Sequence, residues 1–413
     1  MIKKYLIKHI NKMKKFQFSA FVFLALTIIV FSACDNGGEE PETPINLPAE
    51  ELSCDYFTQG ENRTLTDDPN KEVDYIITCR AFVGTDLVIE PGVVIEFQND
   101  AGLEIGDDGS ISALGTSDNP IILTGVDKIA GSWSGILVRS NDVKNEMEYV
   151  TISYGGGSPF NSNDNRANLI LWSGSRLSID NCMFSHSATY GIEMGYQDYT
   201  IPSFTGNSFK NNETPIYTKP ETVHMFDGTS DYTENINDYI VIGCAFLPEG
   251  DFTWKKINVP FRVVATDFGI TRRITMGNQS SLNLEPGVTL QFDTDTELRI
   301  DDGGSLKAVG TENDKITFTG VDGGPGAWSG IYFAFTQSIN NQLDHCIIEY
   351  AGSGNDKAGV KMWADPKLSV TNTLFSEIDG CGILEFGLAF DNSNFSGGGN
   401  TFVNVTGGDT CNK

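Results

Sequence analysis

The sequence predicts an all-β protein, a right-handed parallel β-helix built from two homologous blocks of coils. Three observations support this fold class. Short β-prone segments end at Gly, Asp or Asn; the same segments recur about 195 positions later; and no long segment after Cys34 has a 3.6-residue apolar period. A pair of β-sandwiches is the structural alternative, because it would also give short alternating strands.

The chain begins with a segment typical of export. Six lysines lie within the first 15 residues, and "FQFSAFVFLALTIIVFSAC" then runs apolar to Cys34. We interpret residues 1–33 as a signal peptide. Ser32 and Ala33 before Cys34 resemble the lipobox of bacterial lipoproteins, which implies that Cys34 bears the lipid and inserts it into a membrane. A transmembrane anchor is the alternative, although the apolar run is near the lower length limit for a span.

Residues 34–53 are predicted to form a flexible acidic tether, because "DNGGEEPETPINLPAEELS" is rich in acids and Pro and poor in apolar residues. Acidic stretches after a lipid-bearing Cys resemble surface-export tethers of Bacteroidetes-type bacteria. We therefore expect an exported outer-membrane lipoprotein that faces outward.

The charge of the chain excludes one class of partner. The formal net charge is −27, from 28 basic and 55 acidic residues. Without residues 1–33, which hold six Lys and no acid, 22 basic residues face 55 acidic ones, giving −33. Nucleic acid is not expected as a partner, because phosphate binding needs a basic surface.

The folded part is an internal duplication. Residues 88–136 align without a gap with 283–331, and 24 of 49 positions are identical. Farther along the chain, equivalent residues of the two copies are 196 and then 191 positions apart. The first copy therefore has five extra residues, within "SPFNSNDNRAN". Such a small polar insertion is expected in an exposed loop. We predict a first β-helix block at 54–245 and a second, continuous with it, at 246–413.

Short motifs predict how the coils turn and stack. "EPGV" at 90–93 and 285–288 is interpreted as a type II turn, with Pro at the second position and Gly at the third. Asn followed by Phe two or three places later predicts a tight bend and a stacked core ring. This pattern occurs at 181–184, 207–209, 372–375 and 400–402.

The cysteines suggest disulfides but no zinc site. Cys54 and Cys79 are 25 residues apart, and Cys381 and Cys411 are 30 apart, close to the predicted coil length of about two dozen residues. Each pair could link neighbouring coils near one end of the protein. No CxxC motif or Cys/His cluster is present.

Several segments together resemble a known family. "LVIEPGVVIEF", "GSISALGT", "GSWSGILV" and "YVTISYGG", with their second copies, resemble the surface-exposed right-handed β-helix lipoproteins of Bacteroidetes-type bacteria, which have a pectin-lyase-like fold. The resemblance covers most of residues 75–402. It implies the fold and export as a lipoprotein, and it implies no single activity.

The residues provide no catalytic set. Polysaccharide hydrolases on this fold have "NTD", "GHG" and "RIK" motifs, and these are absent here. Adjacent carboxylates in two duplicated turns could offer oxygen ligands to calcium. These residues are Asp107, Asp108, Asp301 and Asp302. We prefer a turn role for them, so that no cofactor is expected and calcium is the alternative.

Aromatic residues recur at matching positions and are the candidate ligand-binding residues. Flat rings on one face of a β-helix could stack on sugars, although packing between coils explains the recurrence equally well. The pairs are Trp133 with Trp328, Trp172 with Trp363, and Tyr154 with Tyr350.

The sequence therefore predicts a non-catalytic cell-surface lipoprotein that binds a glycan or a surface protein through a lateral face of the β-helix. A polysaccharide lyase or glycoside hydrolase that acts on acidic polysaccharide is one alternative. A structural component of the cell envelope is the other.

Overall fold

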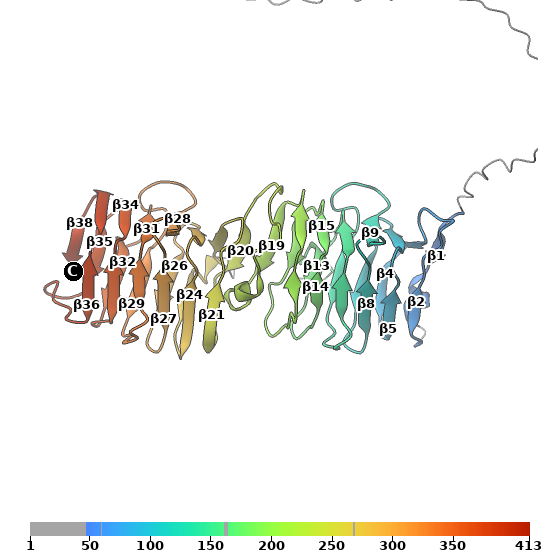
Figure 1. Cartoon of the computed structure of the whole chain (residues 1–413), viewed down its shortest axis with the longest axis horizontal. Helices are drawn as coiled ribbons and strands as arrows, with labels where there is room; N and C mark the ends of the chain where they lie inside the picture. Colours follow the sequence, from blue (N-terminus) through green and yellow to red (C-terminus); the bar gives the residue numbers. More distant parts are fainter. Residues whose placement is uncertain (1–46, 59, 161–163, 267–268) are drawn as a thin grey trace, which may run out of the picture. The chain divides into compact units, whose positions relative to one another are not determined.

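A computed structural model describes residues 47–413 except 59, 161–163 and 267–268. These residues belong to one compact unit, Ile45–Lys413. Its strands wind as successive parallel coils, from β1 to β38, into a right-handed parallel β-helix (Figure 1). The predicted fold class is confirmed. Among the described residues, no helix has the length and apolar character needed to cross a membrane.

The strands form five sheets, one of which extends through the whole β-helix. This long sheet takes one strand from each of 13 coils: β4 (Arg80–Val83), β7 (Gly102–Ile105), β10 (Ile136–Val138), β13 (Ala167–Leu171), β16 (Tyr190–Glu193), β19 (Thr214–Thr218), β20 (Ile240–Gly243), β22 (Phe261–Val264), β25 (Thr289–Phe292), β28 (Ile316–Gly320), β31 (Cys346–Glu349), β34 (Leu374–Ile378) and β37 (Thr401–Val405).

Two further sheets belong to the N-terminal half. The β1–β18 sheet holds β1 (Glu50–Leu52), β3 (Tyr75–Ile77), β6 (Val94–Phe97), β9 (Ile121–Gly125), β12 (Val150–Ser153), β15 (Met183–Ser185) and β18 (Ser208–Lys210). The β2–β17 sheet holds β2 (Arg63–Leu65), β5 (Asp86–Ile89), β8 (Ser110–Leu114), β11 (Glu146–Glu148), β14 (Ser178–Asp180) and β17 (Phe204–Thr205).

The other two sheets belong to the C-terminal half. The β21–β36 sheet holds β21 (Gly250–Trp254), β24 (Ser280–Leu284), β27 (Ser305–Val309), β30 (Gln342–Asp344), β33 (Leu368–Thr371) and β36 (Phe395–Gly398). The β23–β38 sheet holds β23 (Arg273–Met276), β26 (Glu297–Ile300), β29 (Ile331–Ala334), β32 (Ala358–Trp363), β35 (Cys381–Glu385) and β38 (Gly408–Asn412). A short helix, α1 (Cys54–Thr58), and a 3-10 helix, η1 (Pro220–Met225), complete the described elements.

Strands that correspond in the two blocks lie in different sheets. β6 and β25 are 195 positions apart, yet β6 lies in the β1–β18 sheet and β25 lies in the long sheet. Likewise β7 lies in the long sheet, whereas its counterpart β26 lies in the β23–β38 sheet. The second block is therefore turned by one face of the β-helix relative to the first. Equivalent side chains of the two blocks face different directions.

The predicted EPGV turns and stacked Phe rings are confirmed, whereas the predicted Asn bend is found at Asn181 and Asn372 but not at Asn207 and Asn400. Gly92 and Gly287 have φ of 91° and 85°, as a type II turn requires. Phe184 stacks on Phe209 with ring centres 5.2 Å apart. Asn181 adopts the left-handed bend with φ of 53°, as expected.

Asn207 has a different role from Asn181, because it sits one position later in its coil and points inward. Its side-chain amide donates to the Ile179 carbonyl (2.9 Å) and its side-chain oxygen accepts the Cys182 N–H (3.0 Å). Asn400 makes the equivalent bonds to Val370 and Thr373. An Asn side chain, buried at position 207 and half-buried at position 400, thus ties each of these coils to the coil before it.

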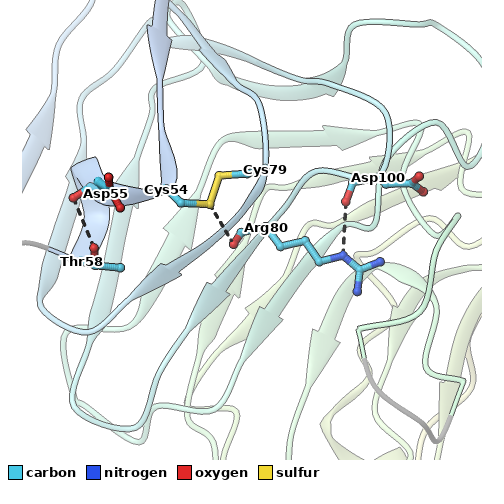
Figure 2. The surroundings of a disulfide bond; sticks show 6 residues. All are labelled: Cys54, Asp55, Thr58, Cys79, Arg80 and Asp100. Carbon is cyan, nitrogen blue, oxygen red and sulfur yellow. Dashed lines mark hydrogen bonds between the residues drawn. A yellow bond between two sulfur atoms is a disulfide. The ribbon is translucent and has the colours of Figure 1, made fainter.

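Two disulfides join neighbouring coils. Cys54 pairs with Cys79 and Cys381 pairs with Cys411, with Cα atoms 6.1 and 6.0 Å apart, and these are the two pairs considered from the sequence. Figure 2 shows the first disulfide between α1 and the segment that leads into β4, where Arg80 Nε donates to the Asp100 carbonyl at 3.2 Å.

The β-helix begins earlier than the predicted boundary at Cys54. β1 pairs in parallel with β3, and Leu47 bridges to Lys71, so that residues 47–53 of the predicted tether join the first coil. Residues 1–46, and with them the predicted signal peptide and Cys34, lie outside the described residues.

Candidate functional site

Two of the six candidate aromatic residues are part of the core. Trp133 and Trp328 are fully buried, and each stacks on a Phe ring (Phe97 and Phe292) at 4.1 Å. Each indole N–H donates at 2.8 Å to a backbone carbonyl of the next coil. A ligand-binding role for these two residues was therefore wrong: their recurrence reflects packing between coils.

The other four candidates do not form one surface. Trp172 follows β13 in the long sheet, whereas Trp363 ends β32 in the β23–β38 sheet, because the second block is turned by one face. Tyr154 and Tyr350 are half-buried at bends with φ of 65° and 62°, and Tyr154 stacks on His186 at 4.7 Å. The expected shared aromatic face is absent from the described part of the chain.

The insertion of the first block does not extend freely into solvent. Phe160, within it, packs on the outer face of β7 so closely that a Cβ on Gly102 would lie 2.7 Å from its ring. Arg80 donates to the Pro159 carbonyl at 2.7 Å and lies over the Phe160 ring at 5.5 Å. The predicted exposed loop is therefore only partly exposed among its described residues, because Asp164 is exposed whereas the half-buried Phe160 packs on the sheet.

Phe160 helps to cover a small apolar cluster on the outer side of the long sheet. Leu137, Ala167 and Ile170 are fully buried although they lie apart from the main core. Phe160, Trp172 and Tyr190 pack over them. All five residues of β13 are buried.

A cavity of about 510 Å³ lies beside this cluster, over the coils that contain β16 and β19. Its walls come from the end of the insertion, from the outer face of the long sheet and from the corner after β16. The lining includes Asp164, Asn165, Arg166, Tyr190, Glu193, Tyr196 and Tyr217. Its size suits one or two sugar rings or another small polar ligand.

Glu193 is the buried polar group of the cavity. It is 8% exposed, and its carboxylate accepts the side-chain amide of Asn165 and the backbone N–H of Arg166 (2.9 Å). Burial raises its pKa from 4.5 to about 7, although the two hydrogen bonds oppose this change. The group can therefore exchange a proton near neutral pH.

Among the described residues that line the cavity, Arg166 is the one Arg or Lys, and it pairs with Asp164 at 2.7 Å. Burial also raises the pKa of Tyr190 to about 12, so that its hydroxyl stays neutral. With Glu193 ionised, the cavity is net negative.

An aromatic wall supports the cavity at its corner. The rings of Tyr190 and Tyr217 lie 5.5 Å apart, with their planes at 45°. Tyr196 packs on Trp172 at 4.0 Å, and Arg139 lies 4.5 Å from the Trp172 ring while pairing with Glu104 at 2.6 Å. Trp172, one of the predicted residues, thus positions Tyr196 rather than lining the cavity.

This site belongs to the first block alone. At the spacing of 191 between the copies, Leu384 takes the place of Glu193, and Lys361 takes the place of Ile170. Glu297 occupies the position equivalent to Gly102, whose lack of a side chain makes room for Phe160 in the first block. Since duplicated features are explained by the fold, a site built from unduplicated residues is the better candidate for function.

No metal centre was found among the residues that the structure describes, since no three His, Cys, Asp or Glu side chains lie together. Of the four Asp residues considered for calcium, Asp301 accepts hydrogen bonds from Arg299 at 2.8 and 3.0 Å.

Comparison with known proteins supports the architecture of the first block. Residues 61–194 match the family model of the pectate-lyase-like β-helix domain. This part of the chain is thus similar to pectate-lyase-like β-helices. No curated protein and no solved structure matches the chain. The match ends at Met194, so that it includes Glu193 but not Tyr196 or Tyr217 of the cavity lining.

Sequence reasoning missed Glu193, Tyr190 and Tyr217 because it searched among duplicated residues. The available signal was the five-residue insertion, which marks the place where the two copies differ. The contacts of that insertion with the coils after it could not be read from the alignment.

Proposed function

We propose that the protein is a non-catalytic, glycan-binding lipoprotein of the outer membrane, and that it binds a neutral glycan in the cavity beside β16 and β19. The observation that carries this proposal is the combination of three Tyr side chains and a buried, hydrogen-bonded carboxyl in one cavity. Aromatic rings pack on the apolar faces of sugars, and carboxyl and amide groups bind sugar hydroxyls.

The charges favour a neutral glycan over an acidic one. A uronate carboxylate would lie near Glu193, and the guanidinium that could neutralise it, on Arg166, already pairs with Asp164. Like charges placed together without screening are unfavourable. The cavity therefore gives no support to the alternative of an enzyme that acts on acidic polysaccharide.

Attachment to the membrane and display at the cell surface remain inferences from the sequence. They rest on the apolar leader, Cys34 and the acidic segment after it. Removal of surface-exposed protein from intact cells by a protease tests this part separately.

Binding can be tested with a glycan array followed by titration calorimetry of the neutral oligosaccharides that bind. Tyr217→Ala should weaken binding about tenfold, equivalent to about 1.4 kcal/mol, because one stacking ring is lost. Tyr217→Phe keeps the ring and should retain most of the affinity. Tyr350→Ala, half-buried in the other block, is the matched control. Equal affinity of wild type and Tyr217→Ala would contradict the site.

Glycoside hydrolysis is a second candidate, and one observation favours it. A carboxyl group with a pKa of about 7 inside a cavity can donate a proton to a leaving oxygen at neutral pH. Hydrolysis would also need a second carboxylate to activate water, and Asp164 is the other acid of the lining. Release of reducing ends from a bound neutral glycan by wild type, and not by Glu193→Gln, would establish this activity in place of simple binding.

A further inference from the structure

The second block has its own unduplicated aromatic residue at an equivalent corner. The Ser140 hydroxyl donates to the Gly109 carbonyl, and in the second block the Thr336 hydroxyl donates in the same way to the Gly304 carbonyl. The two glycines are 195 positions apart, whereas Ser140 and Thr336 are 196 apart. One residue has therefore been inserted just before Thr336. That residue is Phe335.

Phe335 is held in an unfavourable backbone conformation and gains little burial from it. Its φ is +60°, a region that bulky residues rarely adopt, and its N–H donates to the Trp363 carbonyl at 3.1 Å. Its side chain is 47% exposed. Burial of the ring therefore does not account for this backbone conformation.

Trp363, the second member of the pair, has lost the cover that its first-block counterpart has. Trp172 lies beneath Tyr196 and Arg139, but the corresponding positions in the second block hold Gly387 and Ala334. Trp363 is 45% exposed, and the centre of its ring is 5.0 Å from that of Phe335, with the planes at 57°. The two rings form an open aromatic corner.

We propose that Phe335 and Trp363 form a second glycan-binding platform, which stacks on the apolar face of a neutral sugar ring. The ligand class rests on the proposed function, because this corner corresponds to the one beside the first-block cavity. Polar groups lie at its edge: Gln337 donates to the Asp365 carbonyl at 2.9 Å, and both side chains are exposed. Such groups can bind the hydroxyls around a stacked ring.

The position of the platform makes the protein bivalent. From β16, beside the cavity, to β31, in the coil of Trp363, the long sheet advances by six strands. At about 4.8 Å per strand this separates the two sites by roughly 29 Å along the β-helix. They also face different directions, since Trp363 belongs to the β23–β38 sheet. Two separate glycan chains can thus be held at once.

The test uses calorimetry with a neutral hexasaccharide selected on the array and precipitation of its parent polysaccharide. Wild type should bind two hexasaccharides and cross-link the polymer. Trp363→Ala and Phe335→Ala should each reduce the stoichiometry to about one and abolish precipitation. Phe82→Ala is the matched control, because Phe82 is 46% exposed in the first block. It should behave as wild type does.

The outcomes separate the two sites. One bound hexasaccharide in wild type that Tyr217→Ala weakens and Trp363→Ala leaves unchanged would overturn the platform and leave the cavity standing. Binding that only Trp363→Ala weakens would support the platform and refute the cavity. Failure of every neutral glycan to bind would refute both. A wild-type dimer that Trp363→Ala dissociates, with no change in glycan binding, would instead make this corner a self-association surface and overturn the platform.

Discussion

Replacing Glu193 with Gln should remove a pH dependence of stability that the wild type carries. The folded protein holds this carboxyl at a pKa of about 7, against 4.5 without burial. A raised pKa favours the protonated form in the folded state. Its stabilising effect is therefore fully present below about pH 4.5 and is lost as pH rises through 7.

The expected size follows from the pKa values. A pKa difference of one corresponds to about 1.4 kcal/mol, so that the change from 4.5 to about 7 gives about 3 kcal/mol between pH 4 and pH 8. Gln has no charge to bury and should not show this change. It does lose an acceptor, because one of the two donors that face Glu193, Asn165 or the Arg166 N–H, would meet an NH₂ group. That loss is independent of pH.

The assay is urea unfolding of wild type and Glu193→Gln at pH 4, 5, 6, 7 and 8. The quantity of interest is the difference between their free energies of unfolding, which cancels the titration of all other groups. As pH rises, the free energy of unfolding of the wild type should fall by about 3 kcal/mol relative to that of Glu193→Gln. Most of this fall should occur between pH 4.5 and 7. A difference that stays constant within about 0.5 kcal/mol would refute the burial of an ionisable Glu193.

Four further variants test the fold. Trp133→Ala and Trp328→Ala should each lower the free energy of unfolding by about 3–5 kcal/mol, because both rings belong to the core. The variants that fold should still bind glycan. Denaturant melts that show unchanged stability would contradict this prediction. Replacing both Cys54 and Cys79 with Ser should lower the free energy of unfolding by about 3 kcal/mol, since the bond closes a loop of 25 residues; an equal unfolding midpoint with and without reductant would argue against the disulfide. Asn207→Ala should cost about 1–3 kcal/mol, because buried backbone groups of the previous coil lose their partners, and thermal unfolding would register this as a lower midpoint.

The repeating features of the fold could be predicted because each has a local physical cause. The "EPGV" turn follows from the restricted φ of Pro and the free φ of Gly, and the stacked Phe rings follow from the constant spacing of coils. Alignment of the copies also placed the candidate Trp pairs correctly in equivalent positions. It could not show that Trp133 and Trp328 point inward, since both lie outside the strands, where the alternation of side chains does not indicate direction.

The candidate site depends on differences between the copies, and this is why it escaped prediction. Phe160 can pack on the long sheet because Gly102 has no side chain there. The two residues are far apart in the sequence, and only the coiling of the chain brings them into contact. The turn of the second block by one face likewise leaves no trace in the alignment. It separates Trp172 from Trp363 and so removes the single aromatic surface that duplication suggested.

A crystal structure of the protein with a neutral oligosaccharide selected on the array tests the central claim most directly. A sugar ring should lie against Tyr190 and Tyr217, with a hydroxyl within hydrogen-bond distance of the Glu193 carboxyl. A bound glycan that leaves this cavity empty, or an acidic oligosaccharide that occupies it in preference to the neutral one, would contradict the account.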